Sequence, residues 1–453
     1  MKKFIAFLLA LWIVLGLCAC GGNGGEHAAL QAGFGRANIS PTKPLGMSGY
    51  GDAETRLSGA ILDDIYATCV AFREGETTFL VFTVDVCGVS NVAGNQLRST
   101  VSSATGVPQE HIFVGATHTH SAPSWNGSTS SGCVTAAKAA IADLAPATME
   151  TASAQLENMN FVRHYLMNDG TYYGSNFGSD ISGFKEHVMD PDKQLSLLKL
   201  ERGDKKDILM VNWQAHPAAA ARQADYTGVS ADFVGFARKK VEMDAGVLMA
   251  YYTGASGNLN PRSLIGKENT NNNTNYQNYG ATLGEKIIET MEKLTPAEGS
   301  GMVSTYSKVP VEVDHSWDHM ASQASEVVSV WKNQSLEAGH KLARQYGMSS
   351  AYHANAILRK GALKEQQYRE LYAFRIGAVG FVTNTYEMFC DHGQYVKEGS
   401  PFETTFIITG CSGYIANEQA YSYRSYESDT SPYVSGTGEK LAEELTRMLN
   451  TLK

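Results

Sequence analysis

The sequence has few charged residues for its length and no cluster of basic ones. Lys, Arg, Asp and Glu make up 18% of the 453 residues, hydrophobic residues make up 43%, and the formal net charge is −9. This composition excludes a disordered chain, and the chain is long enough to form a large hydrophobic core. Because the chain is acidic and has no basic run, we expect no nucleic-acid partner.

Cysteine is also scarce, and its spacing forms no known motif. Beyond residue 20 the cysteines are odd in number and include no pair separated by two residues: Cys69, Cys87, Cys133, Cys390 and Cys411. This pattern indicates neither a disulfide framework nor a thiolate zinc site. We expect buried free thiols.

Long apolar runs are absent after the N-terminus, and the N-terminal one is too short to span a membrane. Residues 4–17 are apolar and follow the basic pair Lys2-Lys3, which is the pattern of a secretory signal. The sequence LCAC at 17–20 then resembles a bacterial lipoprotein signal, in which the last cysteine is lipidated and becomes the new N-terminus. An ordinary secretory signal is the alternative.

This interpretation predicts a division of the chain into three parts. Residues 1–19 would be the signal peptide, residues 20–30 a flexible glycine-rich tether, and residues 31–453 one folded domain. The protein would be held outside the cytoplasm on the bacterial membrane by lipid on Cys20. The sequence predicts no oligomeric state.

Strand and helix patterns alternate along the folded part, which predicts an α/β class with a mixed β-sheet core flanked by helices in a single large domain. The polar, helix-patterned segment 317–363 is expected to be an inserted or peripheral element. The predicted strands are 65–72, 78–86, 112–116, 195–200, 208–214, 247–253, 302–313, 403–409 and two within 371–385, and the predicted helices are 93–104, 134–143, 231–243, 279–294 and 438–452.

Two histidines, His118 and His120, follow directly on the apolar strand 112–116. On an extended backbone, side chains at i and i+2 point to the same side, and α/β proteins bind ligands where strands end. Neutral imidazole is the commonest protein metal ligand. The pair is therefore either half of a metal site or two loop histidines without a metal.

Polar residues end other predicted strands as well. Asp85 has an alternative role as a turn cap, and His216 before Pro217 has an alternative role as a core histidine. Glu387 lies in an apolar context, so if buried it must be paired, protonated or bound to a metal. Two histidines and a carboxylate form a standard catalytic zinc set. The long spacings leave the convergence of these side chains open.

An ordered set of motifs resembles the catalytic domain of the neutral/alkaline ceramidase family, over nearly the whole mature chain. The most specific part is THTHSAP at 117–123 with a downstream AHP at 215–217. The full set is GMSGYG at 46–51, ATHTHSAP at 116–123, NWQAHP at 212–217, GASGNLNP at 254–261, YE at 386–387, SPF at 400–402, the stretch 414–421 and YE at 426–427.

The resemblance implies a single Zn²⁺ and a set of site residues. The implied zinc ligands are His118, His216, Glu387 and Tyr414, with Tyr421, Tyr423 and Tyr426 as nearby alternatives to the tyrosine. His120 would contact the substrate or carry a proton, and Arg163 resembles the active-site arginine of the family, although a surface ion pair is its alternative role.

The implied reaction is hydrolysis of an N-acyl bond, in a ceramide or a related N-acyl lipid or amide. Zinc lowers the pKa of its bound water to about 7, and this water attacks the amide carbonyl. Arg163 or His120 would stabilise the oxyanion, and His120 could pass a proton to the leaving amine.

The sequence departs from the family pattern in two places. Asn260 occupies the catalytic position before the proline where the family has a serine, so a water mechanism is favoured over a serine nucleophile. The chain also ends after the predicted closing helix, without the additional C-terminal β-sandwich of the ceramide hydrolases. We therefore expect either a lipid-like substrate or a small amide.

Two other functions remain open at this stage. One is a lipid-anchored binding protein that retains the fold without turnover. The other is a barrel-type metal amidohydrolase or esterase, which would require eight βα units and a further metal-binding histidine or lysine.

Overall fold

The computed structural model describes residues 29–453, apart from 51–54, 175–180 and 272–274. The predicted signal peptide and almost all of the predicted tether lie outside the described residues, and so does Cys20. Within the described part, none of the helices combines the length and the apolar character needed to span a membrane.

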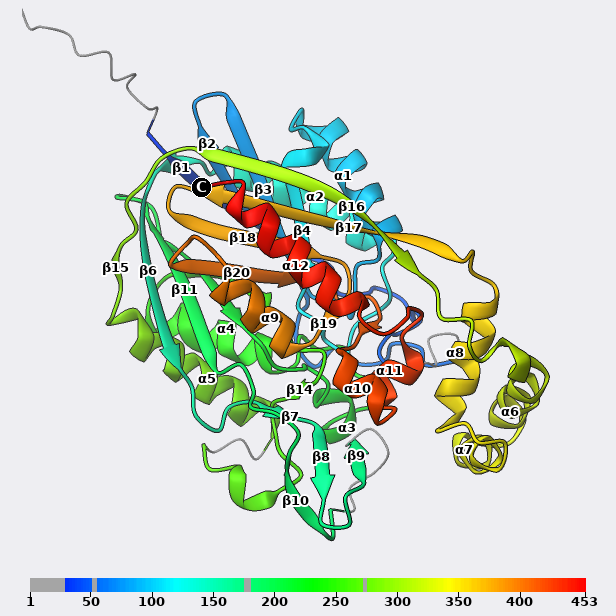
Figure 1. Ribbon diagram of the computed structural model, residues 1–453. Coiled ribbons are helices and arrows are strands. Elements are labelled where there is room, and N and C mark those ends of the chain that lie inside the picture. Colours follow the sequence, from blue (N-terminus) through cyan, green and yellow to red (C-terminus); the bar gives the residue numbers. More distant parts are fainter. Residues whose placement is uncertain (1–28, 51–54, 175–180, 272–274) are drawn as a thin grey trace, which may run out of the picture.

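Three sheets of four or five strands build the body of the molecule (Figure 1). In spatial order, the first contains β4 (Ile112–Ala116), β3 (Thr77–Val84), β2 (Tyr66–Glu74), β1 (Gln31–Asn38) and β5 (Ala145–Pro146). The second contains β13 (Leu248–Thr253), β12 (Ile208–Trp213), β11 (Gln194–Glu201), β6 (Thr148–Gln155) and β15 (Thr295–Pro296). The third contains β16 (Met302–Glu312), β17 (Gln366–Ile376), β18 (Val379–Asn384) and β20 (Thr404–Thr409).

Each sheet is mixed and has its one parallel pair at an edge. These pairs are β3 with β4, β12 with β13, and β18 with β20. The three edges face a shared apolar core that includes Phe113, Tyr252, Phe374 and Phe406. The mixed α/β class is confirmed, whereas the strand orders of the described residues do not form the eight-stranded barrel that one alternative required.

Buried hydrogen bonds join the second sheet to the third. The Asn212 side-chain amide donates to the carbonyls of Tyr252 at 2.9 Å and Ile407 at 2.8 Å, and its oxygen accepts from the Ile407 N–H at 2.9 Å. The Thr409 hydroxyl donates to the Thr253 carbonyl at 3.1 Å. A buried amide with satisfied partners fixes the register between the two sheets.

Helices cover the outer face of each sheet. Their buried side chains join the sheets in three separate apolar clusters. The covering helices are α1 (Asn91–Thr105) and α2 (Gly127–Ala142) on the first sheet, α4 (Phe233–Asp244) and α5 (Tyr276–Met291) on the second, and α9 (Cys390–Glu398) and α12 (Thr437–Asn450) on the third.

A small helical bundle lies at the rim of the molecule (Figure 1). It contains α6 (Ala321–Asn333), α7 (Leu336–Gln345) and α8 (Ala351–Gly361), which share an apolar cluster of their own. The prediction of a helical, peripheral element at 317–363 is confirmed. The shorter elements are β7 (Phe161–Val162), β8 (His164–Met167), β9 (Tyr172–Gly174), β10 (Phe184–His187), α3 (Ala220–Gln223), β14 (Leu259–Asn260), β19 (Glu387–Met388), β21 (Tyr414–Ile415), α10 (Glu418–Ser422) and α11 (Tyr426–Thr430).

The predicted strands and helices are all present, most of them with shifted ends, but β1, β6, α9 and the shorter elements were not predicted. Strand β1 lacks apolar alternation because it contains Gly33 and Gly35. A Cβ atom on Gly33 would lie 2.1 Å from the Ala140 carbonyl oxygen, and one on Gly35 would lie 2.0 Å from the Ala136 carbonyl oxygen. The glycines therefore allow α2 to lie directly on β1. Because they take the place of apolar side chains, the sequence of β1 does not show the alternation typical of a strand.

Candidate metal centre and active site

Three side chains from distant parts of the sequence meet where the sheets end. His118 follows β4, His216 follows β12, and Glu387 follows β18. The Nε2 atoms of the two histidines are 2.9 Å apart, and Glu387 Oε2 is 3.2 Å from the first and 3.8 Å from the second. All three side chains are buried, and together they form a group able to hold a metal ion.

The hydrogen bonds of the two histidines aim their Nε2 lone pairs at one point. The Nδ1–H of His118 donates to the Cys87 carbonyl at 2.5 Å, and that of His216 donates to the Ser256 carbonyl at 3.3 Å. Because a carbonyl only accepts, each Nδ1 carries the proton and each Nε2 is left as an acceptor. These two acceptors converge with the Glu387 carboxylate, whose Oε2 accepts no hydrogen bond from the described residues. Three acceptors that face one another need a metal ion or a proton between them. Burial lowers the pKa of His118, but Cys411, Glu387 and Cys87 outweigh burial and raise it well above its usual value when no metal is bound.

The backbone at His118 differs from the expected geometry. The sequence predicts an extended chain through both histidines, but His118 has φ of 68°, in the left-handed region. His120 Nε2 nevertheless lies 3.3 Å from His118 Nε2. The two side chains do share one side, as predicted, but a strained turn brings them together rather than the alternation of a strand.

His120 is buried between the metal group and the loop that contains Gly49 and Tyr50. Its ring lies edge-on to Tyr50 at 5.2 Å between centroids, and a Cβ atom on Gly49 would lie 2.6 Å from its Cγ. Burial lowers the pKa of His120 well below its usual value, and the neighbouring His118 adds to this effect. The pKa of His216 is also lowered, mainly by burial and to a smaller extent by the neighbouring His118. Both imidazoles are therefore neutral at pH 7, the state that can bind a metal or accept a proton.

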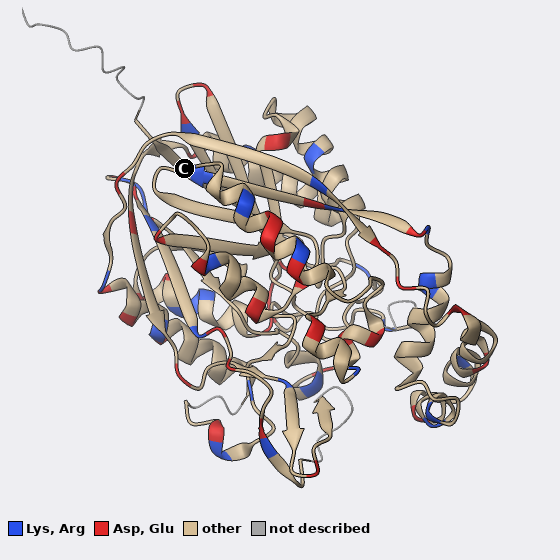
Figure 2. Ribbon diagram, in the orientation of Figure 1, with Lys and Arg blue, Asp and Glu red and all other residues tan. Residues whose placement is uncertain are grey.

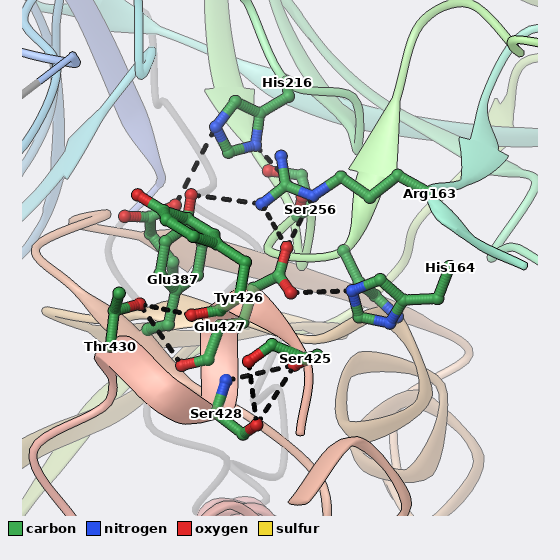
Figure 3. A network of polar contacts seen from close by, with 12 residues as sticks. Arg163, His164, His216, Ser256, Glu387, Ser425, Tyr426, Glu427, Ser428 and Thr430 are labelled. Carbon is green, nitrogen blue, oxygen red and sulfur yellow. Dashed lines mark hydrogen bonds and ion pairs between the residues drawn. The ribbon is translucent and has the colours of Figure 1, made fainter. Parts of the chain in front are cut away.

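Arg163 belongs to a second polar cluster beside the first (Figure 3). It donates through Nε to Glu427 at 2.8 Å. Through Nη2 it donates to the Tyr414 hydroxyl at 3.1 Å. His164 Nε2 lies 2.6 Å from the other carboxylate oxygen of Glu427. All of these groups except Tyr414 are fully buried, so the alternative of a surface ion pair for Arg163 is wrong.

The structure distinguishes between the candidate tyrosines. Glu387 and Tyr414 are directly paired between β19 and β21, and the Tyr414 side chain borders the same cavity as Glu387. Tyr421 donates its hydroxyl to the Tyr433 carbonyl, and the Tyr423 hydroxyl is 2.7 Å from His164 Nδ1. Tyr414 therefore remains the predicted tyrosine ligand, with Tyr426 next to it at 5.7 Å between ring centroids.

A cavity of about 480 Å³ opens on the metal group. His118, His120 and Glu387 contribute to its wall, together with Cys87 and Arg359, which sequence reasoning did not single out. The five cysteines of the described residues are free, and all except the half-buried Cys87 are buried. Cys87 forms a second possible metal group with His118 and His120, but that group shares His118 and contains no carboxylate.

Two of the polar residues predicted at strand ends lie outside this cavity. Asp85 accepts two hydrogen bonds from Arg238, at 2.9 and 3.0 Å, and is a structural residue. Asn260 pairs with Phe161 between β14 and β7 and is not among the described residues that line the cavity. The catalytic role of Asn260 stays a prediction.

Comparison with known proteins identifies the architecture. No family profile and no curated protein matches the chain. A solved neutral ceramidase from Pseudomonas aeruginosa superposes with a TM-score of 0.70 and 15% identity, over 94% of this chain and 74% of that one. This chain has the fold of a neutral ceramidase. A structure of a ceramidase complexed with C2 gives a TM-score of 0.68 and 17% identity, over 94% and 75% of the two chains.

The neutral ceramidase fold confirms the resemblance that the ordered motifs predicted. At these identities it is the fold that is shared, so the chemistry has to be inferred from the side chains described above.

Proposed function

We propose that this protein is a zinc-dependent amide hydrolase of the neutral ceramidase type. The observation that carries the proposal is the convergence of His118 Nε2, His216 Nε2 and Glu387 Oε2, three buried acceptors oriented by their own hydrogen bonds. The shared fold supports the same reaction class.

The donor set fits zinc. Two imidazoles and a carboxylate are ligands typical of a catalytic zinc, and Tyr414 borders the same cavity. A zinc ion held there would supply Lewis acidity and would make a water molecule nucleophilic near neutral pH.

The other buried residues suit the remaining steps of amide hydrolysis. Arg163, fixed by Glu427, presents its guanidinium to the Tyr414 side of the group and would stabilise negative charge on the carbonyl oxygen. His120 is neutral, and its Nδ1 has no hydrogen-bond partner among the described residues. It is therefore able to take up a proton and pass it to the leaving amine.

The test is to measure zinc content and hydrolysis in the same purified samples. His118→Ala and His216→Ala should each lose stoichiometric zinc and reduce hydrolysis of N-acyl amides by at least about a thousandfold, because each removes a direct ligand. His319→Ala, which changes an exposed histidine in the turn before α6, is the matched control and should retain both.

Two results would contradict the proposal. Zinc and activity retained in either ligand variant would overturn the assignment of the site. Stoichiometric zinc without turnover of ceramides, N-acyl amino acids or simple esters would favour the non-catalytic binding protein.

We also propose that the protein is lipidated at Cys20 and acts outside the cytoplasm, with the membrane as its partner. The support is the basic pair at 2–3, the apolar run at 4–17 and the LCAC sequence at 17–20. Cys20→Ser should abolish incorporation of labelled palmitate and release the protein from the membrane fraction. Continued labelling of that variant would contradict this placement.

A further inference from the structure

The wall of the cavity beside the metal group is more polar than a long acyl chain requires. Among its described residues, Ala93 and Trp125 are the only alkyl or indole side chains, apart from the cysteines. Hydroxyl groups come from four serines and two tyrosines: Ser48, Ser90, Ser124, Ser412, Tyr414 and Tyr426. Sites for apolar ligands are lined mainly by hydrophobic side chains. The cavity therefore suits a polar substrate better than a ceramide with two long chains.

A cation from the helical bundle also lines this cavity. Arg359, in the last turn of α8, is exposed and forms no ion pair with any described residue. The bundle reaches the site at a second point, where the Tyr352 ring packs edge-on against Tyr426 at 5.7 Å between centroids. The bundle is peripheral in the fold, but it forms part of the cavity wall.

The surroundings of the cavity add positive charge, although the chain as a whole has a net charge of −9. Arg56 donates through Nη2 to the His120 carbonyl at 2.8 Å, and the Arg222 guanidinium lies 5.2 Å from the centroid of the Tyr50 ring, which packs edge-on against His120. Arg56 donates to the backbone carbonyls of Ser48, His120 and Tyr226, so no carboxylate compensates its charge in these contacts. Elsewhere, basic and acidic residues are interspersed over the elements (Figure 2).

We propose that Arg359 binds a carboxylate carried by the substrate, so that the substrate is a short, polar N-acyl amide with an anionic group, such as an N-acyl amino acid. A guanidinium pairs with a carboxylate through two parallel hydrogen bonds, which gives orientation as well as affinity. This inference rests on the proposed amide hydrolysis and specifies its substrate class.

The experiment compares two substrates that differ only in the charge of the amine part. N-octanoylglycine and N-octanoylethanolamine share the acyl chain and the scissile amide, and only the first carries a carboxylate. The purified zinc-loaded protein is compared with Arg359→Ala, Arg359→Lys and the control Arg344→Ala, which removes an exposed arginine from α7 of the same bundle.

We expect Arg359→Ala to raise KM for N-octanoylglycine at least about tenfold, the effect of one lost charge-assisted contact. The kcat/KM for N-octanoylethanolamine and the zinc content should stay within about twofold of the wild type. Arg359→Lys should retain part of the preference for N-octanoylglycine, because lysine keeps the positive charge but lacks the two parallel N–H donors of the guanidinium. Arg344→Ala should behave as the wild type.

Binding measured by calorimetry separates failure of this inference from failure of the proposed function. If the wild type hydrolyses neither of these amides nor a ceramide, the proposed function fails. Tighter binding of N-octanoylglycine than of N-octanoylethanolamine, weakened at least about tenfold in Arg359→Ala, would then still support the carboxylate site. Equal effects of Arg359→Ala on both compounds, or a wild-type preference for ceramide over N-octanoylglycine, would overturn the inference.

Discussion

Two buried polar clusters lie side by side in this molecule and differ in how far their side chains satisfy one another. In the cluster of Arg163, His164 and Glu427, both carboxylate oxygens are within hydrogen-bond distance of a buried nitrogen. In the cluster of His118, His216 and Glu387, Glu387 Oε2 accepts no hydrogen bond from the described residues. Since burying an unpaired charge costs several kcal/mol, the second cluster needs a bound metal ion or a proton shared with His118, whereas the first is complete in itself.

The largest difference between the clusters should appear when each loses its carboxylate. Glu387→Gln should abolish stoichiometric zinc and lower amide hydrolysis by at least about a thousandfold, because it removes an anionic ligand. The free energy of unfolding of the zinc-free protein should rise rather than fall, because the substitution removes a buried charge whose Oε2 accepts no hydrogen bond there. Metal analysis and urea unfolding with a chelator measure these quantities.

Glu289→Gln, on the exposed surface of α5, is the matched control and should leave zinc and activity unchanged. A loss of several kcal/mol in zinc-free Glu387→Gln would show that the metal group is also complete without a ligand, and the contrast between the clusters would disappear.

The second cluster should respond in the opposite way. Glu427→Gln leaves Arg163 buried without its carboxylate, which should destabilise the zinc-free protein by about 3 kcal/mol. Glu444→Gln, which breaks a surface pair with Arg447, should cost less than about 1 kcal/mol. Folded Glu427→Gln should retain stoichiometric zinc. Loss of zinc at unchanged stability would instead make Glu427 part of the metal group.

The smallest expected effect is the acid dependence of stability. Burial opposes ionisation of Glu427, but the charges of His164 and Arg163 outweigh it and lower the pKa to about 2 from the usual 4.5. The stabilisation is therefore fully present above pH 4.5 and is lost as the pH falls toward 2, on the order of 3 kcal/mol in total. Urea unfolding of the zinc-free wild type at pH 6, 4 and 3 should show this decline.

Glu427→Gln should lack this part of the acid dependence. The same decline in both proteins would assign it to other carboxylates.

Local sequence signals predicted much of the fold and the metal group. His118 and His216 stand directly after apolar strands, and Glu387 is a carboxylate in an apolar segment, so each was conspicuous without its partners. Their convergence was not predictable from spacing. It depends on three sheets that meet at their parallel edges, and the resemblance supplied the grouping that the spacing could not.

Other parts of the site had no signal in composition or periodicity, although the resemblance included YE at 426–427. Glu427 lies in a polar stretch with neighbouring serines and an aspartate, and only the fold brings Arg163 to it. Arg359 is one of several cations on a polar helical segment that looked peripheral. Long-range packing decides the roles of both residues, which is why composition and periodicity do not identify them.

The arrangement of the parallel edges has a consequence for biosynthesis. The proposed histidine ligands follow strands of the first and second sheets, and Glu387 and Tyr414 pair in the short β19–β21 sheet, which comes from the final third of the chain. When His118 and His216 have left the ribosome during synthesis, the chain holds only two of the four proposed metal ligands. With the proposed ligand set, capture of the ion would be a late event, and the compartment that receives the finished polypeptide would also determine which metal it acquires.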